Sequence, residues 1–120
     1  EDGDLLYALY GANSGEVAIS KIKGAINQAI LCIRTKECIE YLYFVLLFNK
    51  DIIVSKFLQG GQGNLSANII KGLKYKLPSI EKKKKIADFL SAIDVKIESL
   101  SNQINQTQNF KKGLLQQMFV

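Results

Sequence analysis

The chain has 120 residues, of which 48 % are hydrophobic and 22 % are charged, and its formal net charge is +5. These values are ordinary for one soluble globular domain, and they exclude a disordered tail; two cysteines are too few for a disulfide scaffold. The excess of basic residues permits a polyanionic partner without requiring one.

The first part of the chain predicts three β-strands. Residues 4–10 mix aliphatic and aromatic side chains and run into the turn sequence GANSG, while residues 16–20 and 26–34 are rich in Ile and Val. The chain also begins nearly in mid-strand, with Glu in place of Met at its first position. We therefore expect it to be a fragment of a longer protein.

The middle of the chain predicts helices. Over residues 37–58 the apolar side chains recur at intervals of three and four residues, as in a buried helix, and a second short helix is expected around residues 51–58. A glycine-rich loop follows at residues 60–66. Its last residue, Ser66, is suited to cap a single helical turn over residues 67–73.

The remainder predicts one more strand and a long helix. The sequence KYKLP alternates as a last strand, and Ser79 is suited to cap the helix that follows. In that helix apolar residues alternate at spacings of four and three, which is the pattern of a coiled-coil seam. The seam consists of Ile86, Leu90, Ile93, Ile97, Leu100 and Ile104, is interrupted at Thr107 and Lys111, and resumes at Leu114 and Met118. A helix of about 40 residues would be roughly 60 Å long, too long for so small a domain to cover.

Four consecutive lysines occupy residues 82–85, close to the positive end of this helix dipole. Two interpretations remain open. The lysines are solvated, with Glu81 and Asp88 offsetting part of the repulsion, or they meet an anion such as a phosphate or an acidic partner surface. Lys83 falls in the seam register, so the pairing contact is expected to begin after it, at Ile86.

Several absences narrow the function. No window reaches the roughly 18 apolar residues of a membrane span, and no cleavable signal opens the chain, so we expect a cytoplasmic protein with no membrane partner. The chain has no histidine, so Cys32 and Cys38 cannot complete an ordinary zinc site and are predicted to be reduced, with no metal bound. No convergent set of base, nucleophile or metal ligand appears, so no catalytic residue is predicted.

Polar and basic residues are candidate contacts for a polyanionic partner. If that partner is DNA, amides and hydroxyls in the turns could read base edges, although ordinary turn chemistry explains the same residue types. These candidates are Asn13, Ser14, Gln62, Asn64, Ser66 and Asn68, with Gln59 also in the loop. Lysines and arginine could contact phosphates, or could simply be solvated. These candidates are Lys21, Lys23, Lys71, Lys74 and Lys76, together with Arg34 and Lys36.

A family resemblance appears at this point. In order along the chain, GDLLYALYGANSGEVA, NQAILCIR, YLYFVLL, GGQGNLSANIIKGLKYKLPSIEKKKKIADFLSAID and FKKGLLQQMF resemble the second half of a target-recognition domain and the following helix in specificity subunits of type I restriction-modification systems. The resemblance covers residues 3–119. The family usually has glutamine where this chain has Lys83, and more often a threonine-glutamine-proline stretch where it has residues 61–63.

The resemblance implies a mixed α/β (α+β) fold. Residues 1–77 would form part of a small target-recognition domain, and residues 78–120 a long helix for coiled-coil pairing and methyltransferase docking. In the family, two such domains each read half of a split double-stranded DNA target, and two helices lie antiparallel between them. Since only one half is present here, a homodimer paired through the seam is left open.

The same resemblance implies that this chain is not catalytic and binds no cofactor. Partner subunits would perform the chemistry: a methyltransferase that uses S-adenosylmethionine, and a restriction endonuclease that uses ATP and Mg. An alternative from another class is an interaction adaptor that does not bind DNA and whose coiled coil only oligomerises. Salt-dependent binding to duplex DNA would separate the two.

Overall fold

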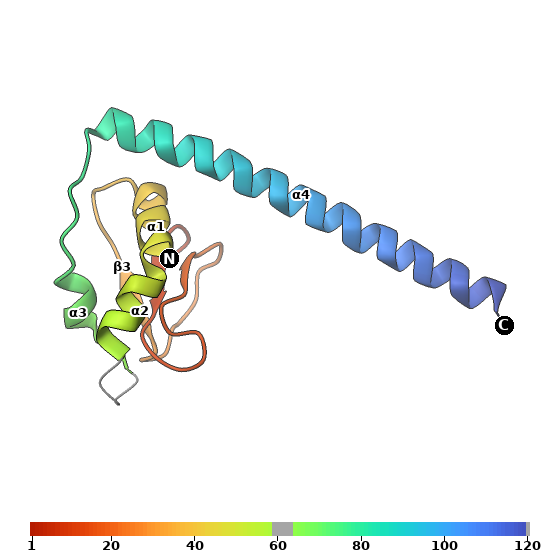
Figure 1. Cartoon of the computed structure of the whole chain (residues 1–120), viewed down its shortest axis with the longest axis horizontal. Helices are drawn as coiled ribbons and strands as arrows, with labels where there is room; N and C mark the ends of the chain where they lie inside the picture. Colours follow the sequence, from red (N-terminus) through yellow and green to blue (C-terminus); the bar gives the residue numbers. More distant parts are fainter. Residues whose placement is uncertain (59–63, 120) are drawn as a thin grey trace. The chain divides into compact units, whose positions relative to one another are not determined.

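The computed structural model describes residues 1–58 and 64–119 and confirms the predicted mixture of strands and helices (Figure 1). The chain divides into two compact units, and the first extends from Glu1 to Ala87. In chain order the elements are β1 (Leu5–Ala8), β2 (Val17–Ile19), β3 (Ile30–Ile33), α1 (Ile39–Phe48), α2 (Lys50–Leu58), α3 (Ala67–Lys71) and α4 (Ile80–Met118).

The three predicted strands form one antiparallel sheet in the order β2-β1-β3. The central strand β1 pairs on both sides, with Leu5 opposite Ile19 of β2 and opposite Ile33 of β3. Leu5 and Tyr7 have no exposed surface, because alternate residues of a strand point to the same face and this face meets the helices. Each strand is shorter than its predicted segment, since most of the flanking residues are irregular.

The turn after β1 allows α2 to approach closely. Gly15 has a positive φ of 86°, which only glycine adopts readily, and a Cβ atom there would lie 2.6 Å from Cγ2 of Val54. Lys50 of α2 also forms an ion pair with Glu16. The sequence GANSG therefore ends the strand and provides the surface on which α2 packs.

The helical region divides as the sequence predicts. Asn49 separates α1 from α2, and its side-chain amide donates a hydrogen bond of 2.7 Å to the carbonyl of Val45. The cap at Ser66 is confirmed, because its Oγ accepts a hydrogen bond of 3.3 Å from the backbone N–H of Ile69. The core gathers residues from β1, β2, α1, α2, Leu65 and α3.

The predicted last strand at residues 74–78 is wrong. These residues form an irregular connection between α3 and α4, and they take no part in the three-stranded sheet of the described chain. Leu73 and Tyr75 are half-buried and pack against the core, whereas Lys74 and Lys76 are exposed. The alternation in the sequence thus comes from packing along an extended connection, without a partner strand.

The Tyr7 hydroxyl is buried and has no hydrogen-bond partner among the described residues. Burial raises the pKa of this phenol to about 12. A buried hydroxyl without a partner keeps its desolvation cost, so Tyr7→Phe should raise the free energy of unfolding by about 1 kcal/mol. Urea denaturation with an unchanged m value would measure this gain, and a loss of stability would contradict it.

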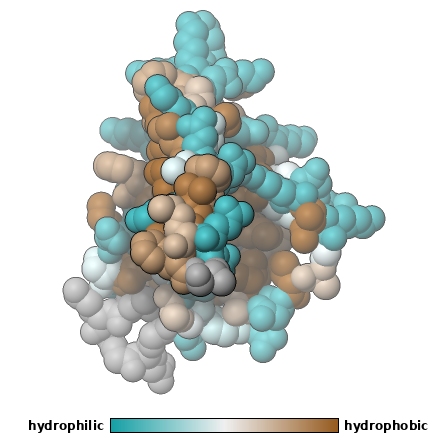
Figure 2. Space-filling view, turned by 90° about the vertical axis from the view of Figure 1, so that its right-hand side faces the viewer, coloured by the Kyte–Doolittle hydropathy of each residue, from teal (hydrophilic) through white to brown (hydrophobic). Residues whose placement is uncertain are grey.

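The long C-terminal helix α4 is continuous from Ile80 to Met118. Its predicted N-cap is present, since Ser79 Oγ accepts a hydrogen bond of 3.4 Å from the N–H of Lys82. From Ile93 onward the predicted seam side chains are between 40 % and 71 % exposed, whereas Ile86 and Leu90 are partly buried. Apolar side chains are visible on the surface in Figure 2. No described helix is long and apolar enough to cross a membrane.

Candidate nucleic-acid interface

The structure brings two predicted polar segments together. Tyr10, two residues after β1, forms an isolated antiparallel bridge with Asn64, and the N–H of Leu65 donates a hydrogen bond of 2.8 Å to the carbonyl of Leu9. The turn that carries Asn13 therefore lies beside the segment that carries Asn64, and both asparagines are exposed. Gln59 and Gln62 lie outside the described residues.

Two of the predicted hydroxyls are used within the chain. Ser14 Oγ donates a hydrogen bond of 3.1 Å to the carbonyl of Leu9, so it braces the turn. Ser66 caps α3. The exposed amide of Asn68, one residue into α3, remains available on the surface. The amides are thus better placed than the hydroxyls for contacts outside the chain.

A groove of about 580 Å³ lies between α2, α3 and the connection that follows α3. No carboxylate of the described residues lines it. Its charged and amide side chains are Asn49, Lys56, Asn68 and Lys74. Its apolar floor includes Ile53, Phe57, Leu73 and Tyr75. Lysines and amides along one groove suit a phosphate backbone, because phosphates attract lysine and accept hydrogen bonds from asparagine amides.

The predicted lysines of this region are divided between two hollows. Lys74 lines the groove, whereas Lys71 lines a neighbouring hollow of about 280 Å³ together with Arg34. Tyr75 lines both hollows, and Lys76 is exposed on the connection.

Sequence reasoning missed Lys56 and Asn49. Both lie in the helical region, where the apolar spacing indicates only which residues face the core. A single lysine or asparagine there has no sequence motif that marks it as a binding residue. Only the packing of α2 beside α3 places Lys56 and Lys74 on one groove.

The family model for the type I restriction modification DNA specificity domain matches residues 1–109. The chain belongs to this family. The matched range includes the whole first unit with its groove and paired loops, and it continues into α4.

Two relatives of this specificity domain come from Methanocaldococcus jannaschii. The type I restriction enzyme MjaVIII specificity subunit is 28 % identical over 121 residues, and the putative type I restriction enzyme MjaX specificity subunit is 30 % identical over 128 residues. Each alignment covers 98 % of this chain but only 28 % and 30 % of the respective relative. The chain thus spans less than a third of the length of these proteins.

The specificity domain places its remaining basic candidates at the other end of the sheet. Lys21 and Lys23 follow β2, beside Asp4, because the N–H of Ser20 donates a hydrogen bond of 2.9 Å to the Asp4 carbonyl. The four residues of β1 span about 13 Å, so these lysines are well separated from the turn at Asn13. The predicted contacts therefore do not form a single cluster. Lys36 is exposed in the connection before α1.

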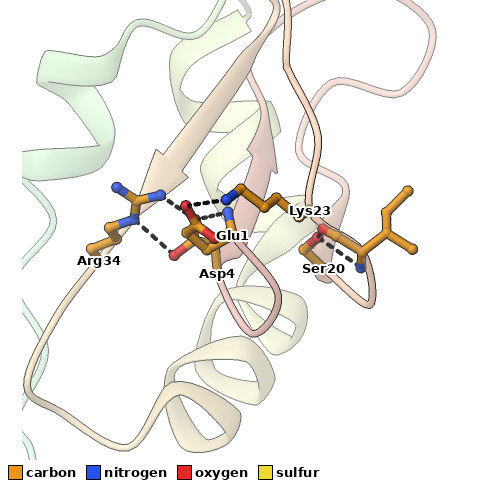
Figure 3. A network of polar contacts seen from close by, with 6 residues as sticks. Glu1, Asp4, Ser20, Lys23 and Arg34 are labelled. Carbon is orange, nitrogen blue, oxygen red and sulfur yellow. Dashed lines mark hydrogen bonds and ion pairs between the residues drawn. The ribbon is translucent and has the colours of Figure 1, made fainter.

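Arg34 has a structural role at this end of the sheet. Its Nε and Nη2 donate hydrogen bonds of 2.8 Å and 2.6 Å to the Asp4 carboxylate, which also accepts one of 2.6 Å from the Glu1 amine (Figure 3). The Arg34 guanidinium holds the pKa of Asp4 well below its usual range. Arg34 thus ties the end of β3 to the residue before β1.

This arrangement predicts a pH dependence. Because the folded pKa of Asp4 is lowered, its stabilising effect is present above the ordinary carboxyl value of about 3.9 and is lost as pH falls through the folded value. Asp4→Asn should therefore lower the Tm at pH 7, and its difference from wild type should shrink below about pH 4. Thermal melts between pH 2 and 7 would test this, and a constant difference over that range would contradict it.

Proposed function

We propose that this chain is the DNA-recognition part of a type I restriction-modification system, and that it directs methyltransferase and endonuclease partners to their target. Membership of the specificity-domain family and the names of both relatives support this function. The observation that carries it is the groove, whose described lining residues include two lysines and two asparagines but no carboxylate.

Each part of the surface has a distinct role in this proposal. Lys56 and Lys74 would contact phosphates and position the protein on the duplex, while Lys71 extends the same basic surface. The exposed amides of Asn13, Asn64 and Asn68 would read base edges, since an asparagine can pair with both N6 and N7 of adenine. Lys21 and Lys23 would at most add phosphate contacts from the other end of the sheet.

We propose in addition that α4 pairs with a second helix, either in another copy of this chain or in a longer subunit, and helps to dock the methyltransferase. The exposed seam supports this, because apolar residues at heptad spacing need a facing helix. In a parallel pair in register, Lys111 would face its own copy. An antiparallel pair with Leu90 facing Leu114 of the second copy separates the two lysines and uses the whole seam, so we favour it.

Chemistry remains with the partners in this proposal. The methyltransferase would use S-adenosylmethionine, and the endonuclease ATP and Mg. The recognition chain would work in the cytoplasm, where it meets double-stranded DNA.

A salt titration tests the function. The purified chain is mixed with a fluorescently labelled random-sequence duplex, and Kd is measured at several salt concentrations. We expect log Kd to rise linearly with log salt, and sequence selection from a random library to enrich one half-target. If no binding occurs at low salt while α4 still self-associates, the adaptor function is correct and DNA recognition is not.

A further inference from the structure

Lys83 is a buried charge at the start of a mostly exposed helix. Its side chain is only 5 % exposed, and Lys83 and Ala87 are the buried residues among those described on α4. The Nζ of Lys83 donates a hydrogen bond to Oε2 of Glu37, which lies 46 residues earlier, in the connection between β3 and α1. This contact lies within the first compact unit, which ends at Ala87.

The four lysines at the start of α4 therefore have different environments. Lys82, Lys84 and Lys85 are exposed, and Lys85 forms an ion pair of 3.0 Å with Glu81 on the preceding turn of the helix. Lys83 instead points inward. A buried ammonium requires a paired charge, since its desolvation is otherwise not compensated. Glu37 provides this charge, and its connection is ordered by a hydrogen bond of 3.1 Å from the Glu37 N–H to Thr35 Oγ1.

Lys83 also occupies a seam position. It lies seven residues before Leu90, and the same heptad position recurs at Ile97 and Ile104. The exposed fraction of the whole residue along this stripe is 4 % at Lys83, 59 % at Ile97 and 57 % at Ile104. One stripe of α4 is therefore buried in the globular unit at its start and exposed further along. A polar residue at a single seam position is a known means of fixing where pairing begins.

We propose that the Glu37–Lys83 ion pair is a positioning anchor, which holds the first two turns of α4 on the globular unit and fixes the residue after which the seam can take a partner helix. The inference rests on the proposed function, because it gives the ion pair the role of fixing where the pairing seam begins relative to the DNA-recognition unit. An apolar residue at position 83 could pack against apolar neighbours in more than one register. The buried lysine ammonium, in contrast, needs the carboxylate of Glu37.

Hydrogen exchange of the full chain tests the anchor without DNA. In Glu37→Gln the buried lysine loses its partner charge, so the amides of residues 80–90 should exchange about tenfold faster, while residues 100–110 are unaffected. The matched control is Glu40→Gln, an exposed glutamate three residues away, which should leave exchange unchanged. The charge-swapped variant, Glu37→Lys with Lys83→Glu, should recover most of the protection that Glu37→Lys alone loses.

A second measurement separates positioning from mere stability. The selected half-target is placed twice in one duplex with different spacer lengths. Glu37→Gln should bind a single copy as wild type does, but should lose the wild-type preference among spacers.

Unchanged exchange in residues 80–90, or a charge swap that recovers no protection, would overturn the anchor. An unchanged spacer preference would overturn its positioning role, whereas a wild-type chain that binds no DNA overturns the proposed function and leaves the exchange result valid.

Discussion

Replacing Ile97 and Ile104 together by glutamate should abolish the proposed pairing of α4 with a second helix. These side chains are 59 % and 57 % exposed, so the substitutions leave the fold of the chain intact and remove only the contact. Burying each side chain contributes roughly 1.5–3 kcal/mol, so the pair should weaken association by about a hundred- to ten-thousand-fold. Sedimentation equilibrium and co-purification with the methyltransferase subunit would measure the loss.

The helix offers a matched control for this change. Val95 and Asn102 have the same seven-residue spacing as Ile97 and Ile104, but they lie outside the seam register and are exposed. Replacing both by glutamate adds the same charge to the same helix. Association should then stay close to wild type, apart from a small electrostatic effect. If the two double variants behaved alike, the seam would not be the pairing surface.

Replacing Lys56 and Lys74 by glutamine should flatten the salt dependence of DNA binding. Each phosphate contact contributes about 0.9 to the slope of log affinity against log salt, so the slope should decrease by about 1.8. Between about 50 and 200 mM salt, the affinity of the variant should therefore fall about 12-fold less than that of wild type. Fluorescence anisotropy with a duplex of fixed sequence would measure both slopes.

Two lysines elsewhere on the chain show whether net charge alone explains this effect. Lys96 and Lys112 are exposed on α4, and replacing both by glutamine removes the same charge. The salt slope should stay near the wild-type value. An equal change in both variants would mean that the groove between α2 and α3 is not where the phosphates bind.

Local rules predicted much of this fold because they act over a few residues. The Ser66 and Ser79 caps follow from their own backbone donors, and the helix α4 with its exposed apolar stripe follows from the spacing of its apolar residues. The wrong prediction of a strand at residues 74–78 has the same origin. An alternating pattern reports alternating burial, and it does not say whether a sheet or a packed connection provides it.

The candidate site was less predictable because it depends on contacts between distant segments. The charge of Lys83 was visible in the sequence, but its partner Glu37 lies 46 residues away with no motif to mark it. Lys56 and Lys74 likewise come from separate elements that only packing brings to one groove. Asn13 and Asn64 were singled out as loop residues, and the bridge at Tyr10 is what makes them neighbours.

That bridge has a consequence for engineering new target preferences. The backbone of Tyr10 joins Asn64, so the turn after β1 and the segment before α3 meet as one surface although they are far apart in the gene. A transplant of either stretch alone from a relative would create a mismatched hybrid at this junction. If these stretches read the target as proposed, exchange of specificity between relatives should succeed only when both are transferred together.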